Sequence, residues 1–178
     1  MRQNYQIDVQ WRAFPLHPET PVDGLPLEEL FAGRNIDIPK AMARLKKVAE
    51  ELGLPLGDRR MTFNSRLAQE LGKWAEGKGK GDDFHNAVFR AYFVDGKNIA
   101  RPDALVELAG AVGLPEGEAG EILKTRAFRQ AVDSDWALCE KMGISAVPNF
   151  VFERQSLVGA QPYEALEELL LESGVKRK

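Results

Sequence analysis

The amino-acid sequence predicts an α/β fold in which a helical block is inserted between strands. Alternating apolar and polar residues near the N-terminus indicate a strand. Helical patterns follow almost without break from Pro39 to Ser145, and a hairpin and a closing helix end the chain. Strands that bracket a helical block usually belong to one sheet. We therefore expect an α/β part formed by residues 1–26 and 143–178, and an inserted helical domain formed by residues 27–142.

The first predicted element is a strand from Tyr5 to Trp11. Apolar residues at positions 5, 7, 9 and 11 alternate with polar residues, which is the period of a strand with one buried face. The next segment, from Phe14 to Pro21, contains three prolines. Because proline lacks a backbone donor, this segment is expected to be an extended loop.

Successive helices are predicted through the middle of the chain. Pro39 suits the first turn of a helix, whose apolar residues recur at helical spacing: Ala41, Leu45, Val48, Ala49 and Leu52. Asn64 suits the N-cap of the next helix. An aromatic stripe from Phe84 to Phe93 is expected in the core. Three further helices are expected to begin near Arg101, Pro115 and Phe128, with their faces packed on one another.

The pattern changes to strands after Gly143. Residues 149–153 and 156–159 predict a hairpin whose turn lies at Arg154 and Gln155. The turn from Gly159 to Pro162 then leads into a closing helix, whose buried side is expected to carry three leucines: Leu166, Leu169 and Leu170.

Composition and charge exclude several classes of function. A chain of 178 residues with 44% hydrophobic residues can bury a sizeable core. A net charge of -3 and a pI of about 5.5 argue against binding nucleic acid or anionic lipid. No apolar run is long enough to span a bilayer, and residues 1–10 are too polar for a signal peptide. We expect no nucleic acid and no membrane among its partners, and a cytoplasmic location.

The single cysteine and the two histidines give little sign of chemistry. Cys139 is the only cysteine, so a Cys-x-x-Cys motif is absent from this sequence, and we expect a buried, inert thiol. His17 and His85 lie too far apart in the sequence to suggest a metal site, and none is expected. Arg12 and Arg34 are candidates for contact with an anionic ligand.

Several segments resemble the DsbA-like thioredoxin superfamily. Gly143–Val151, GISAVPNFV, followed by Leu157–Pro162, LVGAQP, resembles the ending of that superfamily and is most similar to the FrnE-like branch of dithiol-disulfide isomerases. Val9–Glu19 resembles the second strand of that branch and the loop after it. Three further segments resemble its helical insertion: residues 64–68, 89–93 and 96–99. The resemblance implies that residues 1–26 and 143–178 form a thioredoxin-like part.

The resemblance also shows a departure from the family pattern. Family members begin with a strand that ends in Cys-Pro-Trp-Cys or a variant, followed by a helix, and neither is present in this sequence. We therefore expect an incomplete thioredoxin-like fold that is inactive in thiol-disulfide exchange. The missing strand would lie beside Tyr5–Trp11 and Phe150–Phe152. Since both would then expose unpaired edges, a homo-oligomer is expected.

Pro148 is the main candidate for a binding role. The resemblance implies a cis bond between Val147 and Pro148, a geometry that X-Pro bonds adopt most readily. Such a bond would present the Val147 main chain to an extended substrate or to glutathione. Ala146, Val147 and Pro148 are thus the predicted substrate-binding residues, and no catalytic residue is predicted. A simpler interpretation is that Pro148 only begins a strand.

Three functions remain open, and the sequence does not decide whether this chain is an enzyme. The first is a thiol-disulfide oxidoreductase or disulfide isomerase whose cysteines lie outside this sequence. The second is a glutathione-dependent isomerase or transferase of the 2-hydroxychromene-2-carboxylate isomerase type. The third is a non-catalytic binding protein that retains the cis-proline loop. The expected partners are thiol- or disulfide-containing peptides or glutathione, and no bound cofactor is expected.

Overall fold

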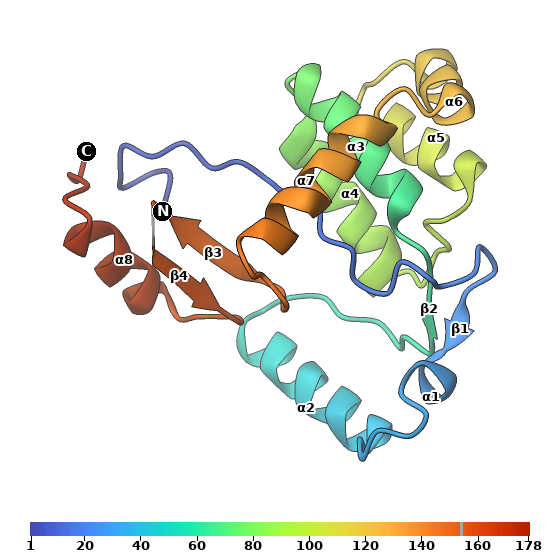
Figure 1. Cartoon of the computed structure of the whole chain (residues 1–178). Coiled ribbons are helices and arrows are strands. Elements are labelled where there is room, and N and C mark those ends of the chain that lie inside the picture. Colours follow the sequence, from blue (N-terminus) through green and yellow to red (C-terminus); the bar gives the residue numbers. More distant parts are fainter. Residues whose placement is uncertain (154) are drawn as a thin grey trace. The chain divides into compact units, whose positions relative to one another are not determined.

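The computed structural model describes residues 1–153 and 155–178 (Figure 1). The chain divides into two compact units, residues 1–14 with 133–178, and residues 15–132. The second boundary falls inside one helix, α7 (Arg129–Lys141). These compact units are not the same thing as an inserted domain. The predicted domain boundaries, at 26/27 and 142/143, therefore stay a prediction.

The larger unit is mainly helical. Its elements, in chain order, are β1 (Leu25–Pro26), α1 (Leu27–Leu30), α2 (Ile38–Glu51), β2 (Met61–Thr62), α3 (Arg66–Gly77), α4 (Gly81–Phe93), α5 (Pro102–Ala111) and α6 (Glu116–Thr125). The strands β1 and β2 form a short antiparallel pair in which Leu25 lies opposite Thr62. Neither strand was predicted, because two residues are too few to show a period.

The core of the larger unit lies among α3, α4, α5 and α6. Leu71, Phe84 and Leu105 are fully buried there. Phe84 and Val88 of the predicted aromatic stripe are buried, but Phe89 is 48% exposed and Phe93 is 38% exposed. The expectation that the whole stripe lies in the core is therefore wrong. One face of α4 is buried, and Phe89 and Phe93 lie to the side of it.

Helix α2 forms almost where it was predicted, yet none of its residues is buried. The Asp37 side chain caps it by accepting a hydrogen bond from the Lys40 N–H at 3.0 Å, and Pro39 occupies the first turn. The helix presents its apolar residues to the surface, so the expectation that the helical faces pack on one another fails here.

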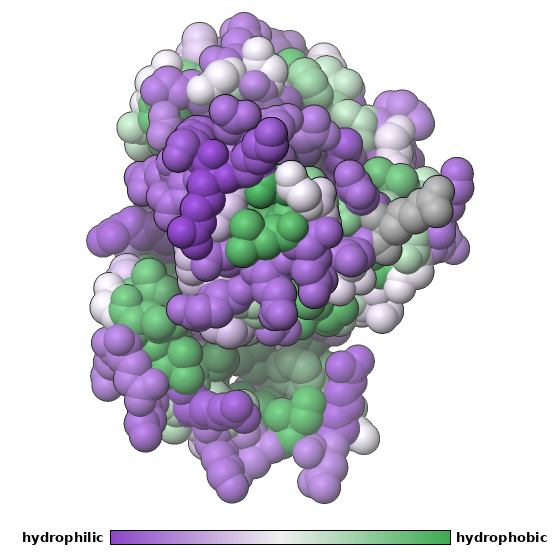
Figure 2. All heavy atoms as spheres, turned by 90° about the vertical axis from the view of Figure 1, so that its left-hand side faces the viewer, coloured by the Kyte–Doolittle hydropathy of each residue, from purple (hydrophilic) through white to green (hydrophobic). Residues whose placement is uncertain are grey.

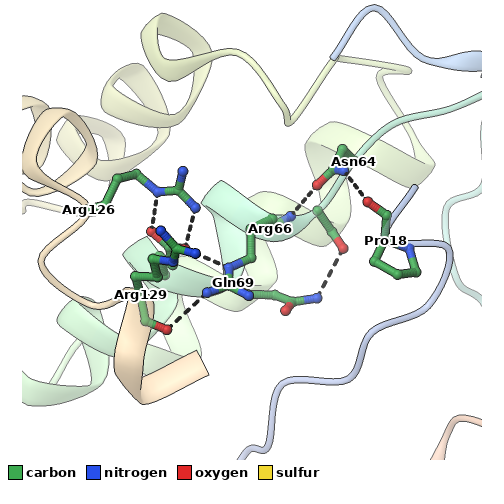
Figure 3. A network of polar contacts seen from close by, with 8 residues as sticks. Pro18, Asn64, Arg66, Gln69, Arg126 and Arg129 are labelled. Carbon is green, nitrogen blue, oxygen red and sulfur yellow. Dashed lines mark hydrogen bonds and ion pairs between the residues drawn. The ribbon is translucent and has the colours of Figure 1, made fainter. Parts of the chain in front are cut away.

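Asn64 anchors the proline-rich loop to the start of α3. Its side-chain oxygen accepts a hydrogen bond from the Arg66 N–H at 2.9 Å. Its side-chain amide donates to the Pro18 carbonyl at 2.9 Å (Figure 3) and to the Thr20 carbonyl at 2.8 Å. The residue directly before the helix is Ser65. Asn64 therefore accepts a hydrogen bond from the first residue of the helix, although it lies one residue before the N-cap position where it was predicted.

Glu70 is the centre of a network of charged groups in the larger unit. Its side chain is 1% exposed. Arg126 donates to its two oxygens at 2.7 and 2.6 Å, and Arg66 donates to one of them at 2.6 Å. Arg66 also donates to the Arg129 carbonyl at 2.9 Å (Figure 3). The network thus joins α3, the end of α6 and the first residue of α7.

One partner of Glu70, Arg126, has an unusual backbone conformation. Arg126 ends α6 with φ 55°, a left-handed conformation that costs a residue with a side chain about 1–2 kcal/mol. Burial raises the pKa of Glu70. The hydrogen bonds from Arg126 and Arg66 outweigh burial, so its pKa lies below the ordinary value. Glu70 is therefore a carboxylate at neutral pH.

The smaller unit contains most of α7, the hairpin of β3 (Asn149–Phe152) and β4 (Gln155–Val158), and α8 (Tyr163–Glu172). The predicted hairpin is confirmed, with Asn149 opposite Val158 and Phe152 opposite Gln155. Arg154, half of the predicted turn, lies outside the described residues, and Gln155, the other half, is the first residue of β4 rather than part of the turn. Leu169 and Leu170 are buried on α8 as predicted, and Leu166 is partly buried.

The predicted strand from Tyr5 to Trp11 is absent. Tyr5 forms one isolated antiparallel bridge with Arg177, and residues 6–11 form no strand. In the described part of the chain, β3 and β4 pair only with each other. The expectation of one sheet that includes the N-terminal segment is therefore wrong here, because alternation makes a strand only where a neighbour supplies hydrogen bonds.

A buried tyrosine holds the N-terminal segment in the smaller unit. Tyr5 is 0% exposed, and its hydroxyl donates to Glu167 of α8. Arg177 donates to the Tyr5 hydroxyl at 2.8 Å and to Glu167 at 2.7 Å. Burial and the Glu167 hydrogen bond raise the pKa of Tyr5 despite Arg177, so the hydroxyl stays protonated as a donor. This cluster joins both ends of the chain to α8.

We predict that Glu70→Gln lowers the free energy of unfolding by about 1–3 kcal/mol at pH 7, because it removes a buried acceptor for two arginines. The pKa of Glu70 is lower in the folded chain than in the unfolded chain, where it is about 4.3. The contribution of Glu70 to the free energy of unfolding is therefore fully present above about pH 4.3, and it is lost as the pH falls through the pKa of the folded state. Urea unfolding between pH 3 and pH 7 measures both effects.

Glu121→Gln is the matched control, because Glu121 forms an exposed pair with Lys124 at 3.3 Å. We expect it to change stability by less than about 0.5 kcal/mol. Equal losses from the two variants would contradict a structural role for the Glu70 network.

Candidate functional site

The candidate site begins where α7 ends. Gly143 adopts φ 68°, a left-handed conformation that glycine accepts without steric cost. The N–H of Gly143 donates to the Glu140 carbonyl and that of Ile144 to the Cys139 carbonyl, both at 2.9 Å. These bonds satisfy the last carbonyl groups of the helix. Gly143 therefore ends α7 sharply and directs the chain into the loop of residues 144–148.

The Val147–Pro148 peptide bond is cis, the geometry that the family resemblance implies. The Pro148 carbonyl accepts a hydrogen bond from the Gly159 N–H at 2.8 Å, and β3 begins at the next residue. Gly159, with φ 90°, belongs to the GAQP segment. The two neighbouring segments that carry the resemblance are thus joined by a hydrogen bond.

The three predicted site residues, Ala146, Val147 and Pro148, are all exposed. The Val147 residue is 42% exposed. Among the described residues, no main-chain hydrogen bond involves Ala146 or Val147. Their N–H and C=O groups are therefore available to a ligand, whereas the Pro148 carbonyl is already paired.

A surface pocket of about 390 Å³ lies beside this loop. Residues 142–146 form one part of its wall, and Asn149, Val151 and Val158 of the hairpin contribute to the rest. The Asn149 side-chain oxygen is buried and has no hydrogen-bond partner in residues 1–153 and 155–178. Asn149 was not among the predicted site residues, although its place directly after Pro148 could have indicated it. The pocket is thus lined by both polar and apolar residues, and the unpaired oxygen of Asn149, one of these residues, is buried.

Cys139 lies near the end of α7, before the loop in the sequence, and is 6% exposed. Its sulfur is 3.7 Å from the Ala13 carbonyl, to which the thiol donates. Burial, and then the charge of Asp135, raise the pKa of the Cys139 thiol, and the opposing effect of Arg12 is smaller. The prediction of a buried thiol is confirmed, and its raised pKa disfavours the reactive thiolate.

Asp135 fixes the N-terminal segment to α7. It is 4% exposed and accepts hydrogen bonds from the Arg12 side chain at 3.1 Å and from the Ala13 N–H at 2.9 Å. Arg12, a predicted contact for an anionic ligand, is therefore occupied with Asp135. Arg34, the other candidate, lies over the Phe31 ring in the larger unit at 5.8 Å.

Both histidines belong to the larger unit. His17 is in the proline-rich loop, 3.6 Å from Glu19. His85 lies within α4, where burial lowers its pKa more than Glu76 and Asp82 raise it. In the described part of the chain, no group of three or more His, Cys, Asp or Glu side chains is placed to hold a metal ion. No helix within the described ranges combines the length and apolar character needed to cross a membrane.

Comparison with known proteins identifies relatives along nearly the whole chain. Residues 1–171 match the family model of the DSBA-like thioredoxin domain. The uncharacterized protein YwbO of Bacillus subtilis (strain 168) is 25% identical over 182 residues, which cover 96% of this chain and 84% of YwbO.

Several solved structures share the fold, and two of them illustrate the similarity to the chain. The probable DsbA oxidoreductase SCO1869 from Streptomyces coelicolor is 26% identical, with a TM-score of 0.83 over 92% of this chain and 74% of that chain. The cytosolic disulfide reductase DsbM from Pseudomonas aeruginosa with GSH is 22% identical, with a TM-score of 0.58 over 83% of this chain and 79% of that chain. These likenesses confirm the expected thioredoxin-like α/β fold with a helical insertion.

We predict that Cys139 in the folded chain reacts with Ellman's reagent at pH 8 at least about tenfold more slowly than in the chain unfolded in guanidinium, because burial excludes the reagent and disfavours the thiolate. Asp135→Asn removes the neighbouring negative charge and should therefore accelerate the reaction of the folded chain.

Glu140→Gln is the control for this charge effect. It removes a carboxylate next to Cys139 in the sequence, but one whose charge is not among the causes of the raised Cys139 pKa. Acceleration by both variants alike would show that general loosening of α7, rather than the Asp135 charge, limits the reaction.

Proposed function

The chain belongs to the DSBA-like thioredoxin domain family, and we propose that it binds thiol- or disulfide-containing peptides or glutathione at Ala146, Val147 and Pro148. The observation that carries this proposal is the exposed and unpaired main chain of Val147 beside a pocket. An extended peptide can add to such a segment by main-chain hydrogen bonds, as a short strand adds to a sheet edge. Val147 would then supply one donor and one acceptor.

Glutathione fits the chemistry of this loop. It places a cysteine between two amide groups, so it can pair with the Val147 main chain on both sides of its thiol. A protein of the same fold, the disulfide reductase DsbM, has been solved with GSH, which supports testing glutathione first.

The proposed role of this 178-residue chain is binding, without catalysis of dithiol-disulfide exchange. Exchange by a Cys-x-x-Cys pair needs a thiolate that attacks and a second thiol that resolves the mixed disulfide. This sequence has one cysteine, and the Cys139 thiol is buried with a raised pKa. The oxidoreductase or isomerase activity of the FrnE-like branch would need a second cysteine-bearing segment.

We also propose a cytoplasmic location and no nucleic-acid partner. A single unpaired thiol suits a reducing compartment, where disulfides are rare. The net charge of -3 gives no electrostatic attraction to phosphate backbones.

An insulin-reduction assay tests the absence of exchange. We expect the chain, with dithiothreitol as the reductant, to precipitate insulin at the rate of the uncatalysed reaction, because no cysteine pair is present to cycle. A thioredoxin of known activity serves as the positive control. Turnover that Cys139→Ala abolishes would overturn the proposed absence of exchange.

Amide NMR during titration with reduced glutathione tests the binding site. We expect the Ala146 and Val147 amide signals to shift, since their N–H groups lie at the proposed contact. Val147→Pro removes the donor, and leaving the ligand carbonyl unpaired costs about 1–3 kcal/mol, or roughly 5- to 150-fold in affinity.

Val22→Pro is the matched control. Val22 is an exposed loop valine next to a proline in the larger unit, and its N–H makes no hydrogen bond to the described residues. The same loss of affinity in both variants, or signals that shift only outside residues 142–158, would refute the proposed site. Circular dichroism establishes that each variant is folded.

A further inference from the structure

Helix α2 carries an apolar seam with the spacing of a coiled coil. Its apolar residues are separated alternately by three and four positions: Ile38, Ala41, Leu45, Val48 and Leu52. This 3.5-residue period keeps one narrow stripe facing a partner helix along the whole length of α2. The seam therefore suits a helix as its partner better than it suits a sheet or a small molecule.

The seam is open to solvent. Leu45 is 55% exposed, Val48 is 43% exposed and Leu52, which follows the last helical residue, is 65% exposed. Ile36 before the helix and Leu54 after it, 43% and 59% exposed, lengthen the apolar surface at both ends. In the lower part of Figure 2, at the height of α2, hydrophobic surface lies between hydrophilic side chains. Apolar surface gathered in this way on a soluble protein commonly marks an interaction site.

The charges beside the seam select the partner. Arg44 and Glu51 flank it on one side, seven residues apart, and the uncharged Met42 and Ala49 flank it on the other. Arg44 has no hydrogen bond or ion pair with the described residues. Glu51 lies 3.9 Å from Lys47 of its own helix, a loose and exposed pair. One end of this flank is thus positive and the other is negative.

This pattern is complementary to itself when two copies run antiparallel. Leu45 then packs in one layer with Val48 of the second copy, and Ala41 packs with Leu52 of the second copy. In the same register, Arg44 of each copy lies beside Glu51 of the other. A parallel pair would place Arg44 beside Ala49 and leave the charges unmatched.

We propose that α2 forms a two-fold symmetric, antiparallel contact with α2 of a second copy of this chain. The contact is isologous, so each attractive pair occurs twice. A helix of 14 residues is about 21 Å long, and two such helices bury less than the ~1,600 Å² of a standard interface. The dimer is therefore reversible and depends on concentration. This surface is separate from the unpaired strand edges on which the sequence-based expectation of a homo-oligomer rests.

Sedimentation velocity of the full chain tests this proposal. Concentrations from about 5 to about 500 μM bracket the dissociation constants expected of a small, weak interface. We expect the wild-type chain to pass from monomer to dimer, and Leu45→Lys to weaken association at least tenfold. Arg44→Glu alone and Glu51→Arg alone should each weaken association, because each places like charges together twice. An equimolar mixture of these two variants restores both attractive pairs and should dimerise as well as the wild type.

Lys40→Glu and Glu50→Arg are the controls, since they make the same charge changes on the outer face of α2 and should leave association unchanged. The variants alter exposed side chains, and circular dichroism confirms that they fold. A wild-type chain that stays monomeric throughout would overturn the proposal. A dimer that Leu45→Lys does not affect would also overturn it, by placing the contact elsewhere, for instance at a strand edge. Failure of the mixture to associate would refute the antiparallel register.

Discussion

Backbone hydrogen bonding is the constraint on which the smaller unit depends, because a strand exists only beside another strand. In the described residues, β3 pairs with β4 alone, and Tyr5 makes one bridge with Arg177. The N-terminal segment has the alternation of a strand and lacks a ladder to join. The main-chain N–H and C=O of Val147 are likewise without a hydrogen-bond partner among the described residues. These free groups are the basis of the binding role proposed for the loop.

Buried carboxylates hold in place segments that are not fixed by strand pairing. Asp135 receives both a side chain and a main-chain N–H from the N-terminal segment, and Glu70 joins three helical segments through Arg66 and Arg126. A buried carboxylate without such partners would be strongly unfavourable. The charged groups of these networks are therefore fixed in place, which is why Arg12 is occupied rather than ready for an anionic ligand.

Surface chemistry distinguishes two regions with proposed binding roles. The loop of residues 144–148 offers main-chain groups beside a pocket, and α2 offers an apolar seam with matched charges. The first suits an extended peptide, since its recognition depends on backbone geometry and tolerates varied side chains. The second suits a helix of defined register, since its recognition depends on side-chain spacing.

The sequence by itself determined the helices, the hairpin and the family. Helical periodicity, first-turn prolines and terminal glycines act over a few residues, so α2 to α8 and the hairpin could be predicted closely. The residues GISAVPNFV and LVGAQP, together with the segments at 9–19, 64–68, 89–93 and 96–99, indicated the DsbA-like fold. Tertiary structure alone decided which apolar faces are covered: Phe84 is buried and Leu45 is not, although both belong to apolar stripes. It also decided that Tyr5 binds Glu167 instead of entering a sheet, and that the Asn149 oxygen lacks a partner. Burial and pairing depend on residues distant in the sequence, and local patterns carry no information about where those residues lie.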